Sequence, residues 1–208
     1  MSLTATPQTT PTVRLATSED VPDLATALAQ SYASCPGWHW YLPIDAKDRQ
    51  RRMERFFRAL VQRYLADGRE CWTTRERNGA ALWDPPECWQ MGNGESLRML
   101  ATMVPAFRRT LMRTVRGFSA LDAVHPREPH YYLSALGVTP GRNGREIAAV
   151  LIAPGLDRCD RERLPCYAET ARPASRDFFA RSGFEVVAEI ELPGGGPVAW
   201  GMWREPVT

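Results

Sequence analysis

The segment GVTPGRNGREIAAVL, residues 137–151, joins the end of a predicted strand to the start of a predicted helix. The strand ends at Val138, a loop of glycine, proline and basic residues follows, and an apolar helix begins at Gly144. Free backbone N–H groups and the positive end of the helix dipole make such a junction a typical phosphate-binding site. Glu146, however, places a carboxylate in the middle of it.

Outward from this junction, the spacing of apolar residues predicts alternating strands and helices. Helices are expected at about 21–32, 53–65, 95–115, 144–160 and 174–182. Strands are expected at 12–16, 70–74, 80–83, 130–138, 165–170, 184–192 and 198–205. This order, β-α-α-β-β-α-β-α-β-α-β-β, predicts one mixed α/β domain with helices packed on a central sheet.

Three local features refine the prediction. Thr17 and Asp20 form a variant of the capping box ahead of the first helix. The aromatic stretch CPGWHWYLP, residues 35–43, is expected to end that helix as a loop. Asn78 and Gly79 predict the turn of a hairpin between the second and third strands.

Length and composition are those of a single domain. The chain has 208 residues without a repeat or a dividing linker, so we expect one domain over residues 13–208 behind a disordered tail, residues 1–12. The net charge of +2 gives no reason to expect nucleic acid as a partner. No apolar stretch reaches the length of a membrane span, and the N-terminal residues lack the features of a secretory signal.

The five cysteines are an odd number with no metal-type spacing. Without an export signal, we expect them as reduced thiols in a cytoplasmic protein, most of them buried as small apolar side chains. No metal site is expected. A small-molecule substrate and a monomeric or homodimeric state complete the prediction.

The element order and five sequence stretches resemble the GNAT superfamily of acyl-CoA-dependent N-acetyltransferases. The stretches are TVRLATSEDVP (12–22), HPREPHYYLSALGVTP (125–140), LIAPGLDRCDRERLPCYAET (151–170), FFARSGFEVVAEIELPGGGP (178–197) and MWREP (202–206). Within the superfamily, these stretches resemble puromycin N-acetyltransferase and its actinobacterial relatives. The resemblance implies a mixed, mostly antiparallel sheet flanked by helices.

The resemblance also implies acetyl-CoA as the cofactor. Leu136 and Val138 lie on the splayed strand that leaves backbone groups free for the pantetheine arm. The loop pattern, Gln or Arg, two residues, Gly, one residue, Gly or Ala, would present N–H groups to the pyrophosphate. This part of the site falls on Arg142, Asn143, Gly144, Arg145, Glu146 and Ala148.

Four positions depart from the family pattern. Asn143 replaces the first Gln or Arg, and Glu146 replaces a glycine. Phe179 stands where the family commonly has the tyrosine that protonates the leaving thiolate, and Ser175 where it has a pantetheine-contacting asparagine. Glu146 either folds back and fills the anion site or points to solvent and lets the coenzyme bind. Glu146 and Phe179 both argue against acetyl-CoA.

Catalytic and substrate-binding positions follow from the same resemblance. Glu169, at the end of a strand, is expected as a general base or as the partner of a cationic amine, with a surface carboxylate as the alternative. Tyr132 and His130 lie on the strand that lines the site, and His130 is either a base or a plain strand-edge histidine. The substrate pocket is expected to contain Tyr32, His39, Trp40, Trp83, Asp84 and Ser134, unless these aromatic residues belong to the core.

Three functions remain open from the sequence. The first is transfer of an acetyl group from acetyl-CoA to an amine of a small molecule, such as an antibiotic or a biosynthetic intermediate. The second keeps the fold and replaces coenzyme chemistry by cyclisation, elimination or isomerisation in natural-product biosynthesis. The third is a non-catalytic small-molecule binder. Departures in the coenzyme loop favour the second and third, whereas the family resemblance favours the first.

Overall fold

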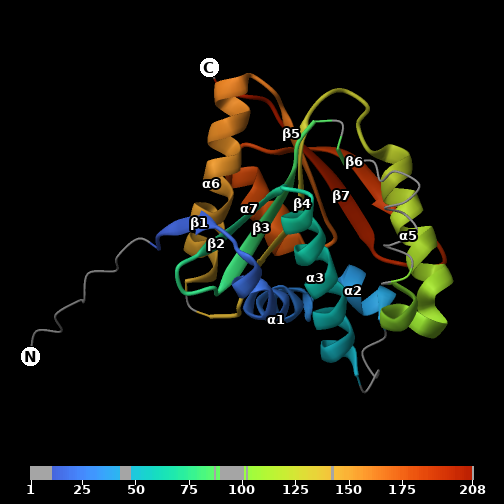
Figure 1. Cartoon of the computed structure of the whole chain (residues 1–208). Coiled ribbons are helices and arrows are strands. Elements are labelled where there is room, and N and C mark those ends of the chain that lie inside the picture. The colour runs from blue at the N-terminus through green and yellow to red at the C-terminus, as the bar shows by residue number, and fades with distance from the viewer. Residues whose placement is uncertain are drawn as a thin grey trace, which may run out of the picture.

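Seven strands form one sheet in the order β1-β2-β3-β4-β5-β7-β6 (Figure 1). This computed structural model describes residues 11–42, 48–86, 88–89, 101, 103–141 and 143–207. The strands are β1 (Val13–Leu15), β2 (Glu70–Thr74), β3 (Gly79–Asp84), β4 (Tyr131–Val138), β5 (Cys166–Thr170), β6 (Glu185–Glu191) and β7 (Val198–Arg204). β4 and β5 are parallel and the other neighbouring pairs are antiparallel, which confirms the predicted mixed sheet.

Helices cover both faces of the sheet (Figure 1). They are α1 (Val21–Tyr32), α2 (Pro36–Tyr41), α3 (Arg49–Ala66), α5 (Leu111–Val124), α6 (Gly144–Glu162) and α7 (Pro173–Arg181), with short 3-10 helices η1 (Ser18–Asp20) and η2 (Arg108–Thr110). One face carries α1 and α3, and the other carries α6 and α7. None of the helices within the described ranges is long and apolar enough to cross a membrane.

Strand β4 contains a β-bulge close to the point where it separates from β5. Leu82 lies opposite Ala135 and Trp83 opposite Leu133, so Ser134 is an extra residue in β4. Such a bulge bends the strand and turns its side chains. β4 and β5 then pair over only three positions, Tyr131 to Leu133, before the strands separate. The sheet therefore opens between the last part of β4 and the end of β5.

The structure corrects two local predictions. Residues 36–41 of the aromatic stretch form helix α2 rather than a loop, because Pro36 at its first position costs no hydrogen bond. The hairpin turn lies over residues 75–78 and uses Arg77 at a φ of 57°, whereas Gly79 is already part of β3. A side chain at Gly79 would clash with the carbonyl oxygen of Gly137, only 2.8 Å from the position of a Cβ atom. Close approach of two strands, rather than a turn, explains this glycine.

The helical tract predicted over residues 95–115 is wrong at its C-terminal end. Residues 103–107 are helical, η2 interrupts the tract, and α5 continues to Val124. Arg108, at a φ of 43°, marks the interruption. Residues 91–100 lie outside the described part, as do the first ten residues of the predicted N-terminal tail.

The predicted cap of the first helix is confirmed. Asp20 accepts a hydrogen bond from the backbone N–H of Thr17 at 2.8 Å, the capping-box contact. Its buried carboxylate also binds Arg14, at 2.7 Å, and Arg77, at 2.7 Å. These contacts attach the start of α1 to β1 and to the β2–β3 turn.

Candidate active site

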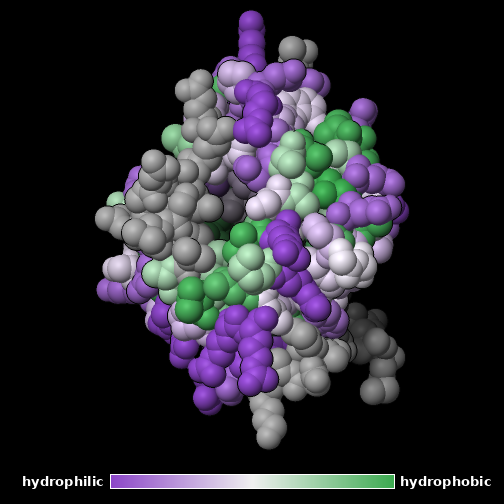
Figure 2. All heavy atoms as spheres, turned by 90° about the vertical axis from the view of Figure 1, so that its right-hand side faces the viewer, coloured by the Kyte–Doolittle hydropathy of each residue, from purple (hydrophilic) through white to green (hydrophobic). Residues whose placement is uncertain are grey.

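A cavity of about 780 Å³ lies between the sheet and helices α1, α2, α3 and α5. This volume suits a small molecule. Figure 2 faces the α5 side of the molecule and shows a hollow there with apolar side chains beside it. Its aromatic lining residues are Tyr32, Trp38, Tyr41, Phe56, Phe57, Trp89, Phe118 and Tyr132.

Glu169 is the centre of a polar cluster in this cavity. The hydroxyl of Tyr132 donates a hydrogen bond to its carboxylate at 3.2 Å, and the hydroxyl of Tyr167 donates another at 3.3 Å. Burial, and then the charge of Glu169, raise the pKa of both phenols, so both stay protonated as donors. Two donors therefore fix a carboxylate at the point where β4 and β5 separate.

His125 lies beside this carboxylate, and sequence reasoning did not single it out. Its Nδ1 atom is 3.8 Å from Oε1 of Glu169, and the imidazole lines the cavity. Its ring stacks on Trp89 with a centroid distance of 3.8 Å, and its edges meet Tyr132 and Tyr167. The segment between α5 and β4 brings the imidazole there, which no periodic pattern in the sequence indicates.

A second histidine orients the first. Nε2 of His125 lies 3.0 Å from Nε2 of His130, and Nδ1 of His130 lies 2.6 Å from the carbonyl oxygen of Glu128. A carbonyl oxygen only accepts, so Nδ1 of His130 carries a hydrogen and its Nε2 accepts one from His125. The neutral imidazole of His125 consequently has its lone pair on Nδ1, on the side of Glu169.

His130 itself does not reach the cavity. It is fully buried, and that burial, with the nearby His125 ring, lowers its pKa, whereas the Glu128 carbonyl acts against this shift. A neutral, buried imidazole behind His125 suits a positioning role. His130 lies on the same side of the sheet as Tyr132 and Ser134, as the alternation predicted, one ring behind the cavity.

The predicted pocket residues divide into two groups. Tyr32, Asp84 and Ser134 line the cavity. Trp83 does not, because consecutive strand residues point to opposite faces. Its ring packs against Gly155 of α6, in the second core.

His39 and Trp40 also lie outside the cavity lining. The Nε2 atom of His39 is 2.6 Å from the carbonyl oxygen of Ala33. Trp40 packs edge-on against Tyr41 and under the guanidinium of Arg113. Both residues of α2 thus support the wall behind the cavity.

Asp84 belongs to a second charged group that lines the cavity. Its carboxylate accepts hydrogen bonds from the Tyr64 hydroxyl and from Arg69, the latter at 2.6 Å. Burial raises the pKa of Asp84, while Tyr64 and Arg69 oppose that shift. Arg63 lies nearby on α3 and lines the cavity, yet its buried Nε and Nη1 atoms have no hydrogen-bond partner among the described residues.

One backbone group of β4 on the predicted coenzyme side already has a hydrogen-bond partner. The backbone N–H of Leu136 donates to the hydroxyl of Tyr32 at 3.2 Å, and burial raises the pKa of this phenol to about 12. The side chains of Leu136 and Val138 pack on the second core with α6. One of the two strand residues expected to bind the coenzyme therefore has its amide occupied by Tyr32.

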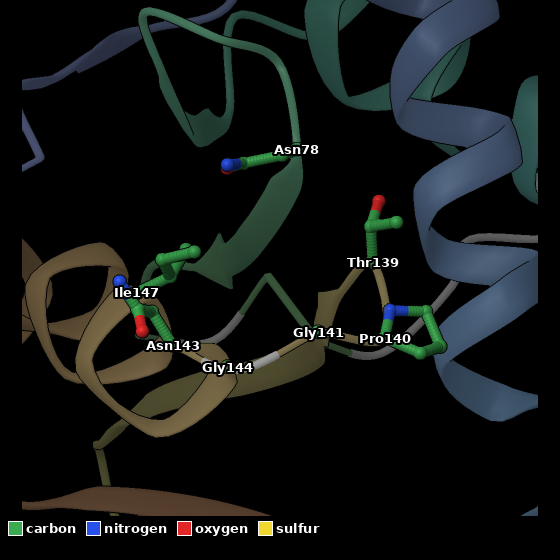
Figure 3. Close-up of a pocket in the computed structure, with 7 residues that line it drawn as sticks. All are labelled: Asn78, Thr139, Pro140, Gly141, Asn143, Gly144 and Ile147. Carbon is green, nitrogen blue, oxygen red and sulfur yellow. The ribbon is translucent and has the colours of Figure 1, made fainter.

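The loop before α6 borders a shallow surface hollow of about 460 Å³ (Figure 3). Its lining residues are Asn78, Thr139, Pro140, Gly141, Asn143, Gly144 and Ile147. Asn78 precedes β3, and the other lining residues belong to the loop after β4 and the first turns of α6.

Glu146 is exposed in the first turn of α6 and has no partner among the residues that the structure describes. The first-turn N–H groups, on Gly144, Arg145 and Glu146, likewise have no acceptor there. Ala148 is on the buried face of α6, and Arg145 is exposed. Arg142, the other basic residue predicted for this loop, lies outside the described residues.

The two departures on α7 differ in environment. Phe179 is 5% exposed and packs against Phe178 and Phe184 in the second core. Ser175, near the start of the helix, is half-buried. Neither residue lines the large cavity.

The fold is shared with solved acetyltransferase structures. A protein described as histone acetyltransferase HPA2 and related acetyltransferase from Corynebacterium glutamicum superposes with a TM-score of 0.71 at 20% identity, over 96% of this chain and 98% of that chain. Polyamine N-acetyltransferase of Drosophila melanogaster, which catalyses the formation of N-acetylagmatine, gives a TM-score of 0.61 at 15% identity, over 93% and 99%. No protein-family model matches the chain.

A third structure with this fold is described as a condensation domain. The C-terminal condensation domain of Ebony, in complex with beta-alanyl-dopamine, gives a TM-score of 0.58 at 11% identity, over 93% of this chain and 98% of that chain. The chain therefore has the GNAT acetyltransferase fold, as the resemblance implied. The finer likeness to puromycin N-acetyltransferase stays a prediction.

Proposed function

We propose that the protein transfers an acetyl group from acetyl-CoA to the amine of a small molecule held in the large cavity. The observation that carries this proposal is the pair formed by His125 Nδ1 and Glu169 Oε1, 3.8 Å apart at the opening between β4 and β5. The GNAT fold of the chain supports an acyl transferase. We also propose that the acceptor is an antibiotic or a biosynthetic intermediate. The protein is proposed to be a monomer or a homodimer and to be located in the cytoplasm.

The pair is suited to an amine. A lone pair on His125 and a carboxylate oxygen of Glu169 are both acceptors, and an ammonium group has three donors. A nitrogen between them donates to both at ordinary hydrogen-bond lengths of roughly 2.9 Å. The aromatic walls then hold the apolar body of the molecule, and Trp89 covers the imidazole.

The same pair also removes a proton from the substrate ammonium group. An ammonium nitrogen attacks a carbonyl carbon only after it has lost a proton, and Nδ1 of His125 takes that proton. The charged imidazole then donates from Nδ1 to Glu169 and from Nε2 to His130. Tyr132 and Tyr167 hold Glu169 in place during this transfer, because both stay protonated.

The described residues fit acetyl-CoA in part. Bound at the opening, the coenzyme supplies an activated acetyl thioester. The N–H groups of Gly144, Arg145 and Glu146, which have no acceptor in the described part of the chain, would hold its pyrophosphate, and the separated part of β4 would receive its pantetheine arm. Phe179 has no proton to give to a leaving thiolate.

One observation favours a second candidate function at the same site. The backbone N–H of Leu136 donates its hydrogen bond to the hydroxyl of Tyr32. The pantetheine arm of a coenzyme that lies along β4 would otherwise accept this hydrogen bond. The second candidate is therefore a reaction without acetyl-CoA, in which His125 and Glu169 abstract a proton from a cavity-bound amine substrate for a cyclisation, an elimination or an isomerisation. A non-catalytic binder would use the cavity without proton transfer.

Acetyl transfer to a panel of arylalkyl and polyamine substrates tests the proposal, with free thiol release and N-acetylated product both measured. We expect His125→Gln and Glu169→Gln each to lower kcat/KM by a factor on the order of 10² to 10⁴, the usual contribution of a general base. Asp23→Asn, exposed on α1 and outside the cavity lining, is the control with unchanged activity. If no amine in the panel is acetylated while the wild-type protein binds them, the second candidate or the binder replaces the first.

A further inference from the structure

The cavity has a second polar region, around Arg63 of α3. Arg69 lies beside it and pairs with the carboxylates of Asp84, at 2.6 Å, and Asp67, at 3.5 Å. Asp84 is already bound by Arg69 and by the Tyr64 hydroxyl. Among the described residues no carboxylate forms an ion pair with Arg63, whereas those of Asp84 and Asp67 pair with Arg69.

Arg63 lowers the stability of the ligand-free protein. Its Nε and Nη1 atoms are buried without a hydrogen-bond partner among the described residues, although the guanidinium lies over the ring of Tyr64, 5.6 Å from its centroid. Leaving buried charged donors unpaired reduces stability, so such a group usually has a partner that binds. A planar guanidinium that faces a cavity is well suited to a carboxylate, which accepts two parallel hydrogen bonds.

The position of this region separates it from the coenzyme loop. Asp84 pairs with Tyr132 near the start of β4, whereas the loop follows Val138 at the other end of that strand. Six strand residues span roughly 20 Å. An anion at Arg63 is therefore not the pyrophosphate of a coenzyme bound at the loop.

The sheet register indicates how far apart the two polar regions are. Asp84 on β3 pairs with Tyr132 on β4, and Tyr132 pairs with Tyr167 on β5, the strand of Glu169. The backbones of Asp84 and Tyr167 are therefore two strand spacings, roughly 10 Å, apart. One benzene ring with a substituent at each end spans a comparable length, and aromatic side chains line the cavity between the two regions.

We propose that the ligand of this cavity is an aromatic amino acid of extended shape, whose carboxylate pairs with Arg63 while its amine lies between His125 and Glu169. The carboxylate and the amine are at opposite ends of the molecule, rather than on one carbon atom. The amine half rests on the proposed function, whereas the carboxylate half rests on Arg63 alone.

Calorimetry without any acyl donor tests the carboxylate half separately. The probes are 4-(aminomethyl)benzoate, benzylamine, which lacks the carboxylate, and 4-methylbenzoate, which lacks the amine. We expect the wild-type protein to bind 4-(aminomethyl)benzoate at least tenfold more tightly than benzylamine. Arg63→Gln should abolish this preference and leave benzylamine affinity unchanged, and Arg58→Gln, exposed on the same helix, should behave as wild type.

Thermal unfolding supplies the second measurement. Because Arg63 has no hydrogen-bond partner among the described residues, Arg63→Gln should unfold at no lower temperature than wild type without ligand, and 4-(aminomethyl)benzoate should stabilise only the wild type and the Arg58→Gln control. The carboxylate subsite is wrong if wild type binds benzylamine as tightly as the acid, binds neither, or keeps its preference in Arg63→Gln. A failed acetyl-transfer assay with a retained preference would instead reject the proposed reaction and keep the subsite.

Discussion

The Nε2 atoms of His125 and His130 lie 3.0 Å apart, a distance that leaves room for one hydrogen between them. The Glu128 carbonyl decides that His125 supplies this hydrogen, because it requires the N–H of His130 on the other side of the ring. Through this contact a residue that never touches the cavity determines which nitrogen of His125 has the lone pair toward the substrate. His130 is thus a positioning residue in the proposed mechanism.

We expect His130→Phe to lower kcat by about 10- to 100-fold with little change in KM, the usual effect of losing a group that orients a catalytic residue. His125 would lose the acceptor of its Nε2 hydrogen and become free to adopt the other tautomer. The pH profile of kcat should therefore shift, which a purely structural defect would not cause. His130→Gln, which keeps a side-chain acceptor, should recover part of the rate; equal losses in both variants would contradict this role.

Glu146→Gly should strengthen acetyl-CoA binding. The change removes a negative charge next to the first-turn N–H groups of α6, and we expect a gain of about tenfold, equivalent to ~1.4 kcal/mol. The helix loses a favourable first-turn carboxylate and gains a glycine, so the free energy of unfolding should fall by roughly 0.5–1 kcal/mol. Calorimetry with acetyl-CoA and a thermal melt check the two expectations.

Glu146→Gln is the matched control for this substitution, because it removes the charge and keeps a side chain of the same size. An affinity gain in both variants would assign the obstacle to charge, and a gain in the glycine variant alone would assign it to the side chain. If both variants bind acetyl-CoA as the wild type does, the exposed carboxylate does not oppose the coenzyme.

Phe179→Tyr should not restore a proton donor for the thiolate. The phenyl ring is 5% exposed and packs against Phe178 and Phe184, so a new hydroxyl would be buried among apolar groups. We expect the free energy of unfolding to fall by about 1–3 kcal/mol and turnover to stay unchanged or to decrease. Denaturant unfolding and steady-state rates measure both, with Phe178→Tyr, at a half-buried position, as the control. A faster Phe179→Tyr enzyme would show that this ring reaches the reacting sulfur.

Asp20→Asn should destabilise the fold in a pH-dependent way. The hydrogen bond with Arg14 is the main cause that lowers the pKa of Asp20 in the folded state, with the Thr17 backbone also contributing. A lowered folded-state pKa means that the carboxylate stabilises the protein above its unfolded pKa of about 3.9 and that this contribution is lost as the pH falls. We expect a difference of about 1–3 kcal/mol near pH 7 that shrinks toward pH 3.

Urea unfolding of wild type and Asp20→Asn across that pH range measures the effect. Asp23→Asn is the control, since Asp23 is largely exposed and meets Arg77 only at 3.3 Å. A difference between wild type and Asp20→Asn that stays constant with pH would mean that the carboxylate charge is not the source of the stability.

The sequence alone determined most of the fold. Amphipathic spacing predicted α1 and α3, clean alternation predicted β6, and the order of the elements, together with the last third of the chain, led to the GNAT fold. These signals are local, since one buried face imposes its period on the residues of one element. Predictions failed where the reason was not local: Gly79 is a glycine because another strand approaches it, and α2 forms where an aromatic loop was expected.

Only the tertiary structure decided the site. Glu169, Tyr132 and Asp84 were predicted from the sequence and do line one cavity, but Trp83 faces the opposite core. His125 and Arg63 gained their importance from neighbours that are 44 and 21 positions away in the chain, Glu169 and Asp84. A side chain acquires its charge partner, or lacks one, only when distant segments pack together, and no spacing along the sequence specifies that distance.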